Sequence, residues 1–289
     1  MKIFVIVWAL LVVSLGVLGQ FRVAPVEASP ILPDEVYQPI VVQVEEKLKQ
    51  PCPDGMIEIE GDYCPVAEEK CLTWVDKHGV ASKDAIPVDG ESGRCGEFVY
   101  PTKCLSDTKA HKHFCIDTYE YPNRAGEKPK SWMSWNQAKT TCESEGKRLA
   151  TSDEWTFACE GPDIQPLPYL DGYHRNRTSC NVDREMPVGI HVLKVSSQSS
   201  PDGQALDSLL KPSGSMLGCV SPFGVHDLVG NIDEFVYNQN GHSNRGPFIS
   251  GLKGGHLAGV RNACRPQTTA HNQSFNWWES GSRCAKDAQ

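Results

Sequence analysis

A short run in the last third of the chain has the residue types of a site for a hard cation. Asp227 and Glu234 lie on either side of Gly230 and Asn231, a pair that tolerates the left-handed backbone of a tight turn. Such a turn bares its carbonyl oxygens, and calcium takes several carboxylate and carbonyl oxygens at once. These residues alone leave two interpretations open, a calcium site or a solvated acidic turn.

Four side chains nearer the C-terminus could bind a metal ion or an anion. His256 and His271 are a possible metal-binding pair, and Arg261 and Arg265 could hold an anionic ligand. The competing interpretation is that isolated loop histidines are surface or packing residues. No Ser/His/Asp nucleophile motif accompanies them, and no glycine loop has the strand-to-helix context that phosphate binding requires.

Two further histidines, His111 and His113, are separated by one residue in a segment rich in aromatic and β-branched residues. This spacing would place them on the same side of a strand. By itself the pair indicates surface histidines and not metal ligands.

The chain contains twelve cysteines, and all of them follow an apolar N-terminal segment. An even number in an exported chain predicts disulfides and not free thiols. Zinc binding is the alternative, but it would favour CxxC pairs, and the sequence has none.

The first 50 residues indicate export. Met1 and Lys2 precede an apolar run over residues 3–19, and Ala28 ends a small-residue cleavage pattern. We predict a signal peptide over residues 1–28, with an uncleaved membrane anchor through residues 3–19 as the alternative. The protein would then be periplasmic or extracellular, and it would meet a membrane only if this segment is uncleaved. Residues 29–50 have the composition of a linker.

Length, composition and net charge limit the size of the folded domain and the classes of partner. The chain has 289 residues, 39% of them hydrophobic, which permits one large folded domain with a real core. The net charge is −8 and no long basic block occurs, so we expect no nucleic-acid partner.

Two short helices are predicted by capping boxes that begin at Ser134 and Thr151. The first helix carries Cys142 on its apolar face and the second carries Cys159, so we expect each to bond to a distant segment. Residues 64–104 hold four cysteines and many turn formers, which indicates a loop-rich insertion stapled by disulfides.

Short strands separated by turns are expected elsewhere. Alternating Ile and Glu over residues 57–60 predict a strand that ends at Gly61. Residues 162–220 show little periodicity, and we expect no regular element there. Three segments have the pattern of closing strands: 251–255, 260–266 and 281–284.

Taken in order, five blocks resemble the sulfatase-modifying-factor family, whose founding member is the formylglycine-generating enzyme. The resemblance covers roughly residues 52–287 and implies a domain over residues 51–287. The implied fold is the α+β, C-type-lectin-like formylglycine-generating-enzyme fold, with little regular secondary structure and with disulfides and bound calcium that hold it. The blocks are GMIEI (55–59), FCIDTYEYPN (114–123), the segment 134–155 with GKRL (146–149), PFG through GNIDE (222–234), and KGG (253–255) with GSRC (281–284).

The resemblance also implies individual residue roles. Cys142 should pair with Cys284 and Cys159 with Cys264, and we add the hypothesis that Cys180 pairs with Cys219. The six N-terminal cysteines allow 15 pairings, which stay open. A structural calcium would be bound by the side chains of Asp227 and Glu234 and the carbonyls of Gly230 and Ile232. A second calcium site would begin at Asn181 and the carbonyl of Val182.

The sequence departs from the family at the active site. The family enzyme oxidises a substrate cysteine to an aldehyde with O₂ and copper bound by two thiolates, which suit Cu(I). Here the corresponding stretch reads GHLAGVRNAC over residues 255–264, with no cysteine before Cys264. We therefore expect no copper site.

Three functional hypotheses follow. The first is a calcium-stabilised, non-catalytic binding module with a loop-built pocket in residues 240–280 for a protein, peptide or glycan. The second is an oxidoreductase of the same family that uses His256, His271, Arg261 and Arg265. The third is a true formylglycine-generating enzyme with a relocated thiol pair.

Overall fold

The computed structural model describes residues 51–76, 94–241, 246–259 and 261–289. The predicted signal segment (1–28) and linker (29–50) lie outside the described residues, as do residues 77–93 of the Cys-rich insertion. In the described part, none of the helices has the length and the apolar character that a membrane crossing requires.

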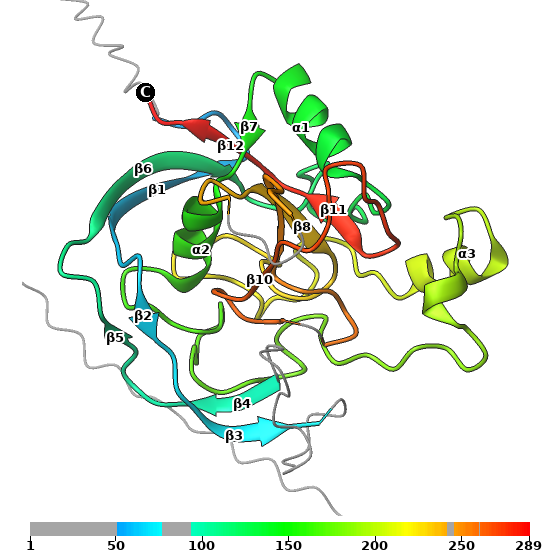
Figure 1. Cartoon of the computed structure of the whole chain (residues 1–289), viewed down its shortest axis with the longest axis horizontal. Helices are drawn as coiled ribbons and strands as arrows, with labels where there is room; N and C mark the ends of the chain where they lie inside the picture. Colours follow the sequence, from blue (N-terminus) through cyan, green and yellow to red (C-terminus); the bar gives the residue numbers. More distant parts are fainter. Residues whose placement is uncertain (1–50, 77–93, 242–245, 260) are drawn as a thin grey trace, which may run out of the picture. The chain divides into compact units, whose positions relative to one another are not determined.

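One sheet joins the two ends of the described domain. Its order is β1-β6-β12-β7, and every neighbouring pair is antiparallel (Figure 1). The predicted strand end at Gly61 is wrong: β1 continues to Tyr63, and Gly61 pairs with Lys112 of β6. A Cβ on Gly61 would lie 3.1 Å from the ring of Phe157, so glycine here permits close packing and not a turn. The strands are β1 (Met56–Tyr63), β6 (Ala110–Asp117), β7 (Arg148–Leu149) and β12 (Cys284–Asp287).

A second sheet has the order β10-β9-β8-β11, and β11 runs parallel to β8. Arg283 is the single residue between β11 and β12, so it lies where the chain passes from one sheet to the other. The expected strand over residues 260–266 is wrong, since residues 261–266 are irregular and the strand begins at Gln267. The strands are β8 (Asp233–Tyr237), β9 (Ser250–Lys253), β10 (Gln267–Thr268) and β11 (Ser280–Ser282).

The insertion is more regular than its composition predicts. Two small antiparallel ribbons form, β2 with β5 and β3 with β4. Disulfides tie each ribbon, because Cys64 bonds to Cys104 and Cys71 to Cys95. The strands are β2 (Ala67–Glu68), β3 (Cys71–Val75), β4 (Arg94–Phe98) and β5 (Lys103–Cys104).

Both predicted capping boxes are present, at Ser134 before α1 (Trp135–Ser144) and at Thr151 before α2 (Ser152–Glu160). The helix α2 lies next to β1 and β6 (Figure 1), and Phe157, Ile59 and Phe114 belong to one hydrophobic core. The expectation of no regular element in 162–220 is wrong. A 3₁₀ turn η2 (Val192–Lys194) and a helix α3 (Pro201–Ser208) form there, and α3 has a Ser N-cap followed by Pro at its first position.

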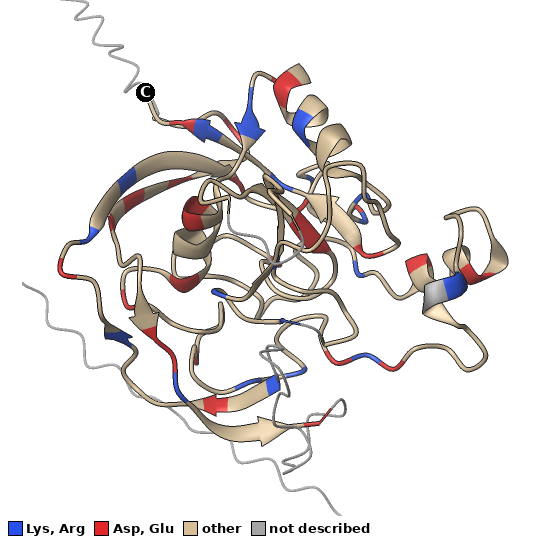
Figure 2. Ribbon diagram, in the orientation of Figure 1, with Lys and Arg blue, Asp and Glu red and all other residues tan. Residues whose placement is uncertain are grey.

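All twelve cysteines are in disulfides, so the alternative that cysteines bind zinc is wrong. Cys142 bonds to Cys284, Cys159 to Cys264 and Cys180 to Cys219, which are the pairings expected from the resemblance and the added hypothesis. The remaining N-terminal pair is Cys52–Cys115. Six disulfides indicate an oxidising environment. Acidic and basic residues are interspersed over the described chain, and Figure 2 shows several acidic positions along β1.

Candidate functional site

Three carboxylates and one guanidinium form a buried ionic cluster at the turn before β8. Its members, called the carboxylate cluster below, are Glu120, Asp227, Glu234 and Arg283, and none is more than 4% exposed. Glu234 accepts two hydrogen bonds from Nε of Arg283 (2.8 and 3.0 Å) and one from its Nη2 (2.8 Å). Trp155 Nε1 also donates to Glu234, at 2.6 Å.

The other two carboxylates are only partly satisfied. Asp227 accepts from the backbone N–H of Gly214 at 2.6 Å. One oxygen of Glu120 accepts from Ser213 and Asn231, both at 2.9 Å, while Oε1 is buried without a hydrogen-bond partner among the described residues. An unsatisfied buried carboxylate oxygen is costly unless something else compensates it.

The pKa shifts in this cluster follow from that imbalance. Burial, followed by the charges of Asp227 and Glu234, raises the pKa of Glu120 well above its ordinary value. Burial likewise raises the pKa of Asp227 to about 6. One guanidinium does not offset three buried carboxylates, and a bound cation would favour the charged forms of Glu120 and Asp227.

The donor set fits a calcium ion in charge and in chemistry. The three carboxylates are not all within 4.8 Å of one another, whereas ligands on opposite sides of a calcium ion are about 5 Å apart. An ion would therefore also need the carbonyls that the Gly230 turn supplies. Gly230 has φ +79°, and a Cβ there would lie 2.5 Å from the carbonyl oxygen of Asn181, so only glycine fits this turn.

The start of the second predicted calcium site lies beside the first. The N–H of Asn231 donates to the carbonyl of Asn181 at 3.0 Å, and Val182 packs on Gly230. The side-chain oxygen of Asn181, however, accepts from Nε of Arg184 at 2.8 Å. Arg283 contacts Glu234 of the first predicted site in the same way, and the second calcium site stays a prediction.

Two of the four proposed catalytic candidates are close together. His256 Nδ1 accepts from the N–H of Ala258, and its Nε2 lies 3.1 Å from Glu279. Arg261 forms an ion pair with Asp233. Burial, followed by the charge of Arg261, lowers the pKa of His256 to about 3, so this histidine is a neutral, buried hydrogen-bond donor to Glu279.

The other two candidates lie in different surroundings. Arg265 pairs with Glu160 at 2.7 Å and donates to the carbonyl of Cys64. His271 stacks on Phe275 with ring centroids 3.7 Å apart. The structure therefore joins His256 with Arg261 but does not assemble the four residues into one centre.

A hollow of about 180 Å³ opens between the insertion and the segment after residue 260. Arg261 lines this hollow, and its Nε is buried without a hydrogen-bond partner among the described residues. Beside it, Arg175 and Arg94 both contact the single carboxylate of Asp183, at 2.7 and 3.6 Å. We call Arg94, Arg175 and Asp183 the arginine cluster. The hollow is lined by Glu69, Cys71, Trp74, Cys95, Phe98, Arg175, Arg261, Asn262, Ala263 and Pro266.

Comparison with known proteins identifies the family. A family model, the sulfatase-modifying factor enzyme 1-like domain, matches residues 61–288. The chain belongs to this family.

The relatives include an enzyme-like protein described as inactive. "Inactive C-alpha-formylglycine-generating enzyme 2" of Bos taurus is 30% identical over 108 residues, which are 37% of this chain and 32% of that protein. The chain thus matches about a third of that relative's length. Two solved structures are also similar: CarF (13% identity, TM-score 0.49, 82% of this chain and 99% of that one) and PvdO from Pseudomonas aeruginosa (15%, 0.44, 80% and 94%).

The residues present do not fit the copper ion of the family enzyme. That ion needs two thiolates, and Cys264, the one cysteine in residues 255–264, is bonded to Cys159. No other thiol is free either, since all twelve cysteines are paired.

Sequence reasoning missed Glu120, Arg283 and the arginine cluster. For Glu120 a signal existed, because it is a charged residue inside the aromatic run Tyr119-Glu-Tyr121. Arg283 stands between the serine-rich β11 and the final cysteine, where nothing local marks it as buried. The arginine cluster joins residues 94, 175 and 183, which only the tertiary fold brings together.

Proposed function

We propose that this chain is an exported binding module, stabilised by calcium, without copper-dependent cysteine oxidation. The observation that supports this most strongly is that every cysteine is held in a disulfide. A scaffold whose family enzyme acts through two thiolates has kept the family blocks here but not the thiols. What remains is a disulfide-held frame that presents loops.

The ligand that fits the hollow carries a negative charge. Arg175 and Arg261 both line the hollow, and Nε of Arg261 has no hydrogen-bond acceptor among the described residues. Arginine holds carboxylates through paired hydrogen bonds. Aromatic lining by Trp74 and Phe98 favours an apolar or sugar surface beside that charge.

The size of the hollow limits what can enter. Its volume of about 180 Å³ is below the roughly 300–1,000 Å³ of small-molecule and cofactor sites. One carboxylate-bearing side chain or sugar unit of a protein, peptide or glycan partner fits this volume better than a whole cofactor does.

Calcium would be held by the carboxylates of Asp227 and Glu234 and the carbonyls of Gly230 and Ile232, with Glu120 as a further oxygen donor. When bound, the ion supplies positive charge and fixes the turn before β8. Around it, Arg283 holds Glu234 in place, and Asn231 orients Glu120. These contacts connect the turn to both sheets, so the ion would stabilise the frame and not act on a ligand.

An oxidoreductase of the same family that uses another centre is the second candidate. One observation favours it: His256 and Glu279 are buried together with displaced pKa values, and such displacement is common at active sites. If a turnover is found, replacement of both His256 and His271 by alanine tests this assignment. Activity that survives the double replacement would remove those residues from the reaction.

The deciding test is mass spectrometry of a Cys-Xaa-Pro-Xaa-Arg peptide after incubation with the calcium-loaded protein, O₂, a thiol reductant and Cu(I). The active family enzyme serves as the positive control. We expect the peptide cysteine to remain unchanged while the protein stays folded by circular dichroism. Conversion to formylglycine would contradict the proposal and would mean that a reducible cysteine pair carries the chemistry.

A further inference from the structure

The outer face of the β1–β6 ribbon gathers carboxylates and histidines. Side chains alternate between the two faces of a strand, so Glu58, Glu60 and Asp62 of β1 share one face, and all three are exposed. The antiparallel register places Glu60 opposite His113 and Asp62 opposite His111. Five potential metal ligands therefore lie on one exposed surface, although the sequence showed only two histidines at strand spacing.

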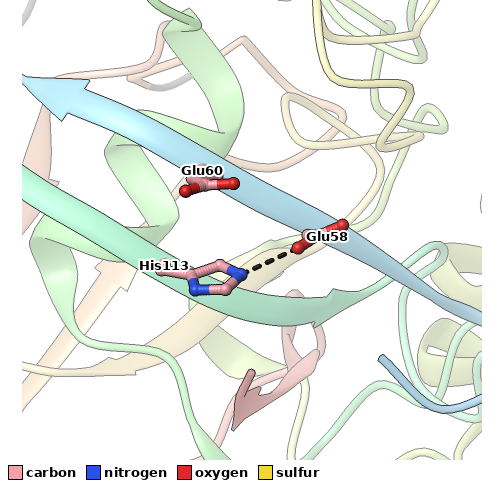
Figure 3. A group of neighbouring side chains, drawn as sticks. All are labelled: Glu58, Glu60 and His113. Atoms are coloured by element: carbon pink, nitrogen blue, oxygen red, sulfur yellow. Dashed lines mark hydrogen bonds and ion pairs between the residues drawn. The ribbon is translucent and has the colours of Figure 1, made fainter. Parts of the chain in front are cut away.

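Three of these side chains form a tight group, which is drawn in Figure 3. His113 Nε2 lies 2.7 Å from Glu58 Oε1. One ligand atom from each of Glu58, Glu60 and His113 lies within 4.8 Å of the other two. Among the described residues, this is the one group of three or more His, Cys, Asp or Glu side chains that approach so closely.

We propose that Glu58, Glu60 and His113 bind a divalent ion of the late first-row transition metals, represented by zinc. Zinc takes imidazole nitrogen and carboxylate oxygen at about 2.0–2.2 Å, which puts neighbouring tetrahedral ligands roughly 3.3 Å apart. The His113–Glu58 contact of 2.7 Å is shorter than that separation, so these two atoms would move apart slightly to bind one ion, and Glu60 is exposed on the same face. The imidazole of His113 favours a transition-metal ion over calcium or magnesium, because those two ions take oxygen ligands.

The group leaves room for a fourth ligand. Three protein ligands on zinc leave one coordination position for water or another donor. His111 is placed to supply it, since its Nε2 lies 3.9 Å from Glu60 Oε1.

The ribbon holds these residues on a fixed backbone. Cys115, two residues after His113, is bonded to Cys52, which ties β6 to the segment before β1. Glu58 and Glu60 precede residue 61, where the match with the family model begins. His113 lies within that match, but the proposed zinc site shares no residue with the carboxylate cluster and does not rest on the function proposed above.

Calorimetric titration of the chain with zinc chloride, in saturating calcium, tests the proposal. Saturating calcium occupies the proposed calcium site in the carboxylate cluster, so that zinc binding there does not contribute to the measurement. We expect one zinc ion per chain, and we expect cobalt(II) to give a visible absorption band on binding to the same site. Loss of a residue that only hydrogen-bonds to a metal ligand weakens metal binding by roughly 10- to 100-fold. His113→Ala removes a ligand itself, so it should weaken zinc binding by more than that, and it should abolish the cobalt band. Glu58→Gln and Glu60→Gln should each weaken binding.

His174→Ala is the matched control. His174 is also exposed and contacts two carboxylates, Asp171 at 2.9 Å and Glu97 at 3.5 Å, but through different ring nitrogens. Its neighbours therefore cannot join it around one ion, and zinc affinity should be unchanged. Wild-type affinity in His113→Ala, or loss of affinity in His174→Ala, would overturn the proposal. The side chains that are changed are on the surface, so circular dichroism should show native folding in each variant.

Discussion

The carboxylate cluster is buried throughout, whereas the arginine cluster is partly exposed, and the named members of the two clusters carry opposite net charges. In the first, three carboxylates meet the guanidinium of Arg283. In the second, two guanidinium groups meet the carboxylate of Asp183, and the charge of Asp76 also acts on Arg94. Buried charge is costly unless it is matched. This difference in charge is the basis of two proposals, a cation at the turn before β8 and an anionic ligand beside the hollow.

The geometry of the clusters differs as well. Glu234 and Arg283 are 1% and 0% exposed in their side chains. In the arginine cluster, Arg175 and Asp183 are 4% and 0% exposed, but Arg94 is 24% exposed. Solvent can screen part of the positive surplus but little of the negative one. We therefore expect mutations in the carboxylate cluster to have larger effects than matching mutations in the arginine cluster.

The largest effect should come from Arg283→Met. This exchange leaves the buried carboxylates without a counter-charge and removes the donor to the carbonyl of His226. We expect a loss of about 3–5 kcal/mol of unfolding free energy in calcium-free buffer, measured by urea denaturation. Exposed Arg124, which pairs with Glu127 at the surface, gives the control Arg124→Met, with a change within about 0.5 kcal/mol. A similar small loss for both would mean that the carboxylates are neutral in the folded protein.

The next largest effect should come from Arg175→Met. Asp183 loses its bidentate partner but keeps Nε of Arg94 at 3.6 Å. We expect a loss of about 1–3 kcal/mol, clearly smaller than for Arg283→Met under the same conditions. An equal loss would break the comparison, because it would show that surplus charge does not distinguish the two clusters.

A smaller, pH-dependent effect is expected at Glu279, which lies outside both clusters and contacts His256. Burial, followed by the charge of Asp233, raises the pKa of Glu279 from an ordinary 4.5 to about 8. The folded protein therefore keeps a proton there that the unfolded chain releases above about pH 4.5. This contribution to stability is complete below pH 4.5 and is lost as the pH rises through about 8.

Denaturation of wild type and Glu279→Gln between pH 4 and 9 measures this contribution. The wild type should lose stability relative to the variant as the pH rises, since glutamine keeps a donor to its neighbours and does not titrate. Exposed Asp54→Asn is the control, and its difference from the wild type should not follow that curve. A pH-independent difference for Glu279→Gln would contradict the raised pKa.

Local patterns predicted the parts of this fold that depend on neighbouring residues. Capping boxes at Ser134 and Thr151 gave both helix starts, and the cysteines on their inner faces lie in long-range disulfides. The predicted strand end at Gly61 was wrong. In a sequence glycine often marks a turn, but here it is needed because the ring of Phe157 packs against its backbone. The difference between a turn and a close contact is decided by tertiary structure.

In the candidate site, too, the residues close together in the sequence could be predicted, and those from distant segments could not. The turn around Gly230 and its two carboxylates were visible in the sequence, because they lie within eight residues. The acidic partner Glu120 and the basic partner Arg283 come from segments more than 45 residues away on either side. Their roles follow from burial and pairing, which local sequence does not encode.

Calcium affinity of the chelator-stripped protein, measured by calorimetry for wild type and Glu120→Gln, tests the central claim most directly. We predict that the wild type binds one calcium ion at the turn before β8 and that the variant binds it about tenfold or more weakly, a difference of about 1.4 kcal/mol. Glu60→Gln removes a surface carboxylate instead and should bind calcium as the wild type does. Failure of the wild type to bind calcium, or equal binding by Glu120→Gln, would contradict the account.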